Sequence, residues 1–291
     1  MPEMPACFSR IPVPALRKPS TSKRHFRLTG GGLRLPRLPS ATLPWLLPLA
    51  LFVLWQASSL LTLLPAVVLP SPAEVVKAFI ELTASGELAR HVGASITRVG
   101  QGFLVGAVAG IGLGLLMGMS RPMEELIHPT FRAFCQVPTM AWLPLLMMMF
   151  GIGEALKLII IVKSTLVPMC INTFSGIRAI PEAYFEVARV CRLTRLALLT
   201  RLILPATIPP VFSGMRQGLA HAWVSLIGVE LLASTVGIGY LMNWGRLVFQ
   251  LDLVFVGIVV IGVIGLAMDS GMRVLERRLG VWRQAAVIDI A

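Results

Sequence analysis

Several side chains that could bind or move a charged solute lie inside long apolar stretches of this sequence. They are Lys163, Arg216, His221, Trp223 and Glu230. A charged side chain at the centre of a membrane costs about 3 kcal/mol on insertion scales, so it faces a counter-charge, an aqueous cavity or a subunit interface. The chemistry indicated is the passage of a charged solute, with snorkelling of the side chains toward the membrane surface as the alternative.

Three of these residues share one face of a predicted helix. Arg216, Trp223 and Glu230 are spaced by seven, which places them within about 40° of one another, and Ser234 falls on the same stripe. The other side carries the small residues Gly214, Gly218 and Ala222, with His221 beside them. Arg216 and Glu230 are about 21 Å apart along the axis, so they cannot pair with each other. The stripe therefore either lines a path or holds two charges that snorkel from opposite ends.

The residue pattern gives little support to enzymatic chemistry. Ser213 is not in a GxS pattern, and His221 lies too far along the same helix to activate it, which argues against an intramembrane protease. The four cysteines include no CxxC pair, so neither a zinc site nor a disulfide framework is predicted. The sequence has no GxxxxGK[ST] segment for binding ATP. We therefore predict no catalytic residue, metal or cofactor in this chain.

The composition indicates a membrane protein. Of the 291 residues, 56% are hydrophobic and 14% are charged, whereas a soluble domain carries about 25% charged residues. These values exclude an ordinary soluble enzyme, and the apolar content excludes a disordered chain. The net charge of +12 comes without basic residues interleaved with aromatic ones, so cytoplasmic loops explain it better than nucleic-acid binding.

Six apolar stretches are long enough to cross a bilayer, which takes about 20 helical residues. They begin near Pro44 and then cover 99–120, 133–153, 158–177, roughly 209–233, and 253–268. In lipid every backbone amide must be bonded within the protein, which favours helices. The sequence thus predicts an all-α membrane protein with six transmembrane helices.

The distribution of basic residues predicts the orientation of these helices. Segments on the side of the N-terminus contain 19 Lys and Arg residues, and they are 1–41, 119–133, 178–206 and 270–291. Segments on the other side contain 5, and they are 65–98, 151–157 and 235–252. Because cytoplasmic loops are enriched in Lys and Arg, both termini are predicted to be cytoplasmic.

Three regions follow from this organisation. Residues 1–41 are rich in Pro and Arg and are predicted to be a disordered cytoplasmic tail that touches anionic lipid. Residues 42–272 form the transmembrane domain, and 273–291 form a cytoplasmic C-terminal tail. Segment 71–96 predicts a short amphipathic helix outside the membrane, with a Gly turn after it.

Two of the spans carry local signals. Glycines recur at every fourth position of the second span, at Gly102, Gly106, Gly110, Gly114 and Gly118. Such a ridge lets a second helix backbone approach closely. In the third span, Pro138 and Pro144 remove helix hydrogen bonds and predict a kinked or broken helix. Such a break indicates either a translocation path or a packing kink.

The cytoplasmic loop 178–206 is the longest between the predicted spans. Pro181 and Glu182 favour the start of a helix, arginines interleave with apolar residues after them, and Pro205 ends the pattern. A short amphipathic helix pair on the cytoplasmic face predicts a docking surface for a soluble partner. The alternative is a helix that lies on the lipid surface.

The spacing of this loop resembles the EAA motif of ABC-transporter permeases. Glu186 and Ala188 match the Glu-Ala-Ala of the motif, Arg192 stands at its Gly, and Leu204 and Pro205 match its Leu-Pro. Further stretches look like the permeases for sulfonates, taurine, nitrate and bicarbonate, and they are 68–79, 137–157, 171–181 and GIGYL at 237–241. The resemblance covers roughly residues 42–283.

This resemblance implies one half of a type I importer in a bacterial cytoplasmic (inner) membrane. Two copies of the permease would form the path for a small anion. Two cytoplasmic ATPases, which bind Mg-ATP, would dock on the loop, with Glu186 at the contact. An external binding protein, periplasmic or lipid-anchored, would deliver the substrate. An ATP-independent channel or secondary transporter is the alternative, and it leaves the docking loop unexplained.

Overall fold

The computed structural model describes residues 43–61, 65 and 68–280 of the chain. The predicted tail 1–41 lies outside them, as does most of 273–291. The chain divides into two units, Met1–Leu49 and Ala50–Ala291. Helix α1 (Leu43–Leu60) begins in the first unit and ends in the second, and all further helices belong to the second. Within the described residues every regular element is a helix.

The second unit continues with a series of helices that are mostly interrupted at glycine or proline. In order they are α2 (Pro72–Ala84), α3 (Glu87–Met119), α4 (Arg121–Gln136), a 3-10 helix (Thr139–Trp142), α5 (Leu143–Phe150), α6 (Glu154–Arg178), α7 (Glu182–Val190), α8 (Arg195–Leu198), a π-helix (Leu199–Ile203), α9 (Leu204–Ala233), α10 (Ile238–Leu247) and α11 (Leu251–Gly280). Helix α2 begins with a capping box between Ser71 and Glu74, and Gly86 turns the chain into α3 with φ 77°. The predicted amphipathic helix and Gly turn are thus confirmed.

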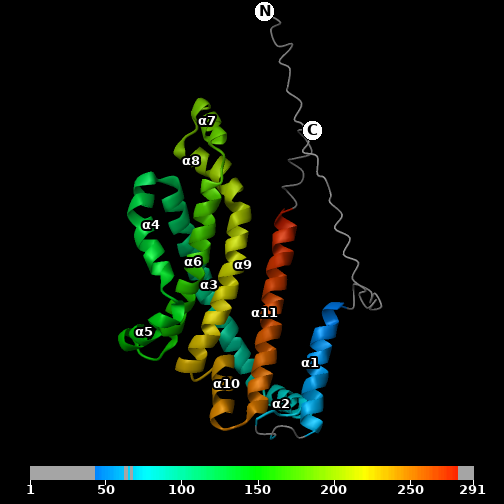
Figure 1. Ribbon diagram of the computed structural model, residues 1–291. Coiled ribbons are helices and arrows are strands. Elements are labelled where there is room, and N and C mark those ends of the chain that lie inside the picture. The colour runs from blue at the N-terminus through cyan, green and yellow to red at the C-terminus, as the bar shows by residue number, and fades with distance from the viewer. Residues whose placement is uncertain (1–42, 62–64, 66–67, 281–291) are drawn as a thin grey trace, which may run out of the picture. The chain divides into compact units, whose positions relative to one another are not determined.

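Helices α3, α6 and α9 pack against one another and form the centre of this unit (Figure 1). The glycine ridge of α3 faces α6. A Cβ atom added at successive ridge glycines would lie 2.5–2.7 Å from atoms of α6 side chains four residues apart, namely Ile161, Thr165, Met169, Thr173 and Ile177. At Gly110 the backbone oxygen of Leu166 would also lie 2.7 Å away. The predicted packing role of the ridge is therefore confirmed, because only glycine permits this approach.

Helix α9 packs on another side of α6 through its own small residues. A Cβ added at Gly214 would lie 3.0 Å from Cβ of Asn172, and one at Gly218 would lie 3.3 Å from Cγ2 of Thr165. Gly214, Gly218 and Ala222 are buried, as their predicted packing face requires. Between α6 and α9, Ser164 donates a hydrogen bond to Ser225 over 2.7 Å. Helix α6 is thus enclosed between two helices that approach it closely.

The third predicted span is broken, as its prolines indicated. Helices α4 and α5, with the 3-10 helix before α5, are bent by 90° at the break between Gln136 and Thr139. Val137 is extended at the break, and Pro138 follows it without a backbone N–H to donate. Helix α4 begins at Arg121, so the segment 119–133, which was predicted to connect two spans, is mostly helical.

By length and composition, three helical stretches among the described residues can cross a membrane. They are Glu87–Met119, Arg195–Ala233 and Leu251–Arg278, and the bent pair Arg121–Gln136 and Thr139–Phe150 makes a fourth if it is one span. The apolar stretch Leu46–Leu60 is shorter. These helices support a multi-pass membrane protein, whereas the number six remains a prediction.

The glycine ridge gives a direct test of the α3–α6 contact. Replacing Gly110 with Ala places a methyl group 2.6 Å from Cβ of Met169 and against the Leu166 carbonyl, so we expect destabilisation by about 1–3 kcal/mol. Gly112 has no atom of this kind within 4 Å and is the matched control. Thermal unfolding of the detergent-solubilised protein should show a lower Tm for Gly110→Ala alone. Equal Tm values for the two variants would contradict the packing described.

Candidate functional site

A cluster of charged side chains joins α3, α6 and α9. Arg98 of α3 donates from Nη1 to Oε1 of Glu230 on α9 over 2.8 Å. Its Nε and Nη2 each donate to an oxygen of Glu154 at the start of α6 over 2.7 Å. Glu230 is 1% exposed and Arg98 is 8% exposed. We call Ser95, Arg98, Glu154, Lys157 and Glu230 the Arg98 cluster.

The remaining acceptor capacity of Glu230 is filled from two directions. Ser95 Oγ of α3 lies 2.9 Å from both carboxylate oxygens, and the Gly239 N–H donates to Oε2 over 3.1 Å. Gly237 has φ 139°, and a Cβ there would collide with the Glu230 carboxylate. Its N–H donates to Nδ1 of His91 over 3.0 Å. The GIGYL segment is therefore hydrogen-bonded to His91 of α3 and to Glu230 of α9. The Glu230 carboxylate lies so close to Gly237 that a larger residue would not fit there.

Glu154 balances the charges of the cluster. Lys157 donates to its Oε1 over 2.8 Å. Hydrogen bonds from Arg98, which has the larger effect, and from Lys157 lower the pKa of Glu154 to about 2. Glu154 is therefore ionised near neutral pH, and the two cations and two carboxylates compensate one another. Such an arrangement holds the helices together.

Lys163 lies at the break of the third span. Its Nζ donates to the carbonyl oxygen of Val137 over 3.0 Å. The ammonium lies 4.9 Å from the ring centroid of Phe134 and 5.5 Å from that of Trp142. Lys163 is 8% exposed. The sequence predicted a cavity, an acid or a subunit interface opposite this residue, and the structure places a backbone carbonyl and two aromatic rings there.

The polar stripe predicted on α9 is divided among separate partners. Arg216 donates from Nε to Asp269 of α11 over 2.6 Å, and Asp269 also pairs with Arg273. Trp223 donates from its indole to the Ile261 carbonyl of α11 over 3.3 Å. His221 is exposed. Glu230, deeply buried, does not snorkel, and Arg216 is held by a neighbouring helix.

The loop 178–206 contains two short helices joined by a tight turn. Arg192, at the position of the motif glycine, has φ 49°. The N–H of Leu193 donates to the carbonyl of Ala188 over 3.0 Å, and Thr194 caps α8 by accepting from the Ala197 N–H. Helix α7 therefore ends before Arg192, which lies in the turn. Leu204 and Pro205 begin α9 directly after the π-helix.

This loop presents a mixed surface. Ala188 is 6% exposed and anchors α7, whereas Glu186 is exposed. Exposed apolar residues lie beside it, and they are Tyr184, Val187, Val190 and Leu196. Arg189 pairs with Glu182 over 2.5 Å within α7. Apolar patches rimmed by charges are typical of protein interaction sites.

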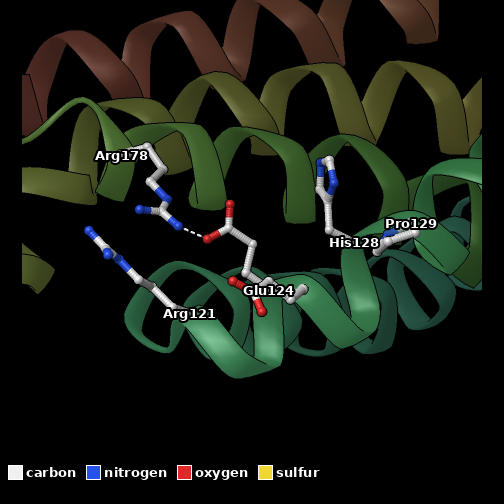
Figure 2. A pocket seen from close by; sticks show the side chains of 6 residues that line it. Arg121, Glu124, His128, Pro129 and Arg178 are labelled. Carbon is white, nitrogen blue, oxygen red and sulfur yellow. Dashed lines mark ion pairs between the residues drawn. The ribbon is translucent and has the colours of Figure 1, made fainter.

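A pocket of about 500 Å³ lies where α4 begins and α6 ends (Figure 2). Its lining residues are Arg121, Glu124, Glu125, His128, Pro129 and Arg178. Arg178, the last residue of α6, forms an ion pair with Glu124 of α4. The imidazole of His128 packs beside the Phe174 ring with centroids 5.6 Å apart. The ion pair between Arg178 and Glu124 thus connects the first half of the broken span to the first residue of the loop 178–206.

Arg98 and Glu154, which hold the largest ionic cluster in the described part of the chain, are not among the site residues that the sequence predicts. Arg98 directly precedes the charge-free run 99–120, and Glu154 directly follows the run 133–153. Both therefore looked like charges that end a span. Glu230 could have indicated such a partner, because a carboxylate inside a span needs a cation from another helix.

The Arg98 cluster predicts a large effect of neutralising Glu230. Glu230→Gln leaves a buried guanidinium with one carboxylate in place of two, and breaking a buried pair costs about 3–5 kcal/mol. We expect a marked fall in Tm for this variant in detergent. Glu81→Gln removes an exposed carboxylate 3.9 Å from Lys77 and is the control, since exposed pairs contribute little. A wild-type Tm for Glu230→Gln would show that the cluster does not stabilise the helices.

Comparison with known proteins identifies the family. The family described as binding-protein-dependent transport system inner membrane component matches residues 106–281. A Bacillus subtilis (strain 168) protein named as an aliphatic sulfonates transport permease, SsuC, is 39% identical over 82% of this chain and 87% of its own length. The taurine transport system permease TauC of Escherichia coli (strain K12) is 28% identical over 84% of this chain and 96% of its own.

A solved structure supports the fold. The crystal structure of an amino acid ABC transporter with histidines matches 70% of this chain and 96% of its own, with a TM-score of 0.54 and 16% identity. The family match, the helices described above and the resemblance of the loop to the EAA motif all indicate a permease. The chain belongs to the family of binding-protein-dependent transport system inner membrane components and is a permease subunit of an ABC importer.

Proposed function

We propose that two copies of this chain form the membrane path of an importer for a small anion. Each copy crosses the inner membrane six times and has both termini in the cytoplasm. Residues 42–272 form the transmembrane domain, with tails at 1–41 and 273–291. The basic asymmetry of 19 to 5 across the predicted segments supports this topology.

The exposed α7–α8 turn is the observation that carries the proposal. It presents Glu186 and the apolar side chains of Val187 and Val190 away from the protein, at 62% and 83% exposure for the two valines. No described part of the chain covers them. A cytoplasmic ATPase subunit that binds Mg-ATP docks on this surface, and the second copy docks a second ATPase. Glu186, Ala188, Arg192, Leu204 and Pro205 form the coupling loop.

Two contacts connect the coupling loop to the broken span. At the cytoplasmic end, Arg178 holds Glu124 of α4. At the break, Lys163 of α6 holds the carbonyl of Val137 over 3.0 Å. Because α6 runs from one contact to the other, a displacement of the loop moves α4 and the break with it. ATP binding and hydrolysis in the partners thereby alternate the access of the path.

The substrate class is a small anion, such as an aliphatic sulfonate, taurine or nitrate. The relatives are named for these solutes, among them the nitrate import permease NrtB of Leptolyngbya laminosa at 34% identity over 62% of this chain. Lys163 supplies a buried positive charge without a paired carboxylate among the described residues. Trp223 and His221 remain candidates for the path, whereas Arg216 and Glu230 contribute paired charges. An external binding protein, periplasmic or lipid-anchored, delivers the substrate.

The coupling loop is tested by reversing the charge of Glu186. Glu186→Lys is expected to weaken ATPase binding or to uncouple ATP hydrolysis from uptake, because it places an unfavourable charge at the docking surface. Pull-down of the ATPase and substrate uptake in proteoliposomes measure the two effects. Arg192→Gly is the matched loop variant, and it should be tolerated because glycine adopts a positive φ freely. Wild-type association and uptake in Glu186→Lys would exclude this loop as the coupling element.

The topology is tested with a reporter fused after Arg283. A reporter that works only in the cytoplasm should be active there, because both termini are proposed to be cytoplasmic. A fusion within the predicted outside segment 65–98, after Ser85, serves as the opposite control and should favour a reporter that works only outside. Activity of the outside-only reporter after Arg283 would rule out an even number of spans with an internal N-terminus.

A further inference from the structure

The break in the third span places exposed, irregular backbone next to a buried cation, Lys163. The described residues at the break are open, since Val137 is 38% exposed and Gln136 and Pro138 are exposed as well. Below them the Lys163 ammonium reaches the Val137 carbonyl. Irregular backbone at membrane depth is tolerated where it is buried in protein or lines a water-filled cavity. The backbone beside this cation is therefore irregular and exposed, and the helix at the break leaves polar groups free for a solute.

Lys163 retains hydrogen-bonding capacity that its neighbours do not use. An ammonium has three N–H donors, and the described contacts use one of them, toward Val137. The rings of Phe134 and Trp142 attract the charge at 4.9 and 5.5 Å but accept no strong hydrogen bond. No described carboxylate lies within ion-pair distance of Lys163. Lys163 thus has N–H donors that no described residue uses, and no described carboxylate pairs with it.

A second donor without an acceptor lies in the same place. The indole Nε1 of Trp142 is buried and has no hydrogen-bond partner among the described residues. A buried N–H that lacks a partner costs about 1–3 kcal/mol, so such groups are rare in folded proteins. The indole of Trp223, by contrast, donates to the Ile261 carbonyl of α11. Trp142 is therefore the exception, and it belongs to the residue whose ring lies against Lys163.

We propose that Lys163 and Trp142 form an oxyanion subsite at the break of the third span. The ligand is the sulfonate or a similar tetrahedral or planar oxyanion group of the transported solute. One oxygen accepts from the Lys163 ammonium and another accepts from the Trp142 indole. This inference rests on the proposed function, because it assigns to the imported anion a place within the permease itself.

The donors select the ligand by charge and by number of acceptor atoms. An oxyanion supplies one negative charge and several oxygens, which together match an ammonium and a separate indole N–H. An uncharged sulfonyl group has acceptor oxygens but no charge. A purely structural role for Lys163, that of holding the Val137 carbonyl, leaves the Trp142 indole unexplained. The subsite accounts for both groups at once.

Binding of ethanesulfonate to the permease–ATPase complex, without the binding protein, tests the subsite. Isothermal titration of the detergent-solubilised complex should detect binding of ethanesulfonate and none of ethyl methyl sulfone, its uncharged analogue. Trp142→Phe keeps an aromatic ring beside Lys163 and removes the N–H, so the Kd should rise about tenfold. Lys163→Gln removes the charge, and the Kd should rise about a hundredfold.

Two variants serve as controls. Trp244→Phe changes a half-exposed tryptophan that stacks on Tyr240, and it should leave the Kd unchanged. Lys163→Arg keeps the charge and should retain most of the affinity. If Lys163→Gln fails to assemble, Trp142→Phe decides alone, because it leaves the contact between Lys163 and Val137 in place. Equal Kd values for Trp142→Phe and Trp244→Phe overturn the subsite.

Competition by inorganic phosphate distinguishes a substrate subsite from a general anion site. Transport measurements distinguish failure of the subsite from failure of the proposed function. Inorganic phosphate that binds as tightly as ethanesulfonate would mark a general anion site and overturn a substrate subsite. A complex that imports ethanesulfonate but shows no binding without the binding protein overturns the subsite and leaves the proposed function standing. Binding that depends on Trp142, in a transporter that imports no anion of this class, supports the subsite as a site and overturns the proposed substrate class.

Discussion

The close approach of α3 and α6 is the constraint on which the rest of the structure depends. Five glycines at four-residue spacing let the two backbones come so near that an added Cβ at Gly106 would lie 2.7 Å from the Val162 carbonyl. This contact fixes the position of α3 along the axis of α6. Arg98 of α3 thereby reaches Glu154 at the start of α6 and also Glu230 on α9.

Burial of charge explains the second level of organisation. Glu230 is tolerated at 1% exposure because Arg98, Ser95 and the Gly239 N–H surround its carboxylate. The same cluster holds the turn between α9 and α10, since Arg98 also donates to the Val236 carbonyl over 2.5 Å. Lys163 is also buried, but its surroundings compensate it only in part. It satisfies a carbonyl that the break leaves free, and its own charge stays without a described carboxylate.

The sequence predicted features that depend on local spacing and failed where partners come from distant segments. The glycine ridge, the break at Pro138 and the Gly turn at Gly86 follow from periodicity and backbone chemistry, and the structure confirms them. The partners of Glu230 and Arg216 lie 132 and 53 residues away in sequence, at Arg98 and Asp269. No pattern within one span encodes such a pairing, so the stripe on α9 looked like one surface, although Arg216 and Trp223 face α11 and Glu230 faces α3.

The turn at Arg192 could be predicted in part, because the motif places a glycine there. Arginine in the left-handed region is strained by about 1 kcal/mol or more, and the neighbouring contacts must offset this cost. The structure supplies them through the bond from Leu193 to Ala188 and the cap of α8 by Thr194.

Helix α6 connects the distant parts, although it is not a uniform rod. Its first residue belongs to the Arg98 cluster, its middle holds Lys163 at the break, and its last residue is Arg178, which pairs with α4. Pro168 lies within it and deprives the Ser164 carbonyl of its helical donor, which favours a bend near the middle. Side chains bridge the weakened turns, since Asn172 donates to the Pro168 carbonyl and Ser164 reaches Ser225 of α9. The helix that links the loop to the break is thus held by side-chain hydrogen bonds on both sides of the proline.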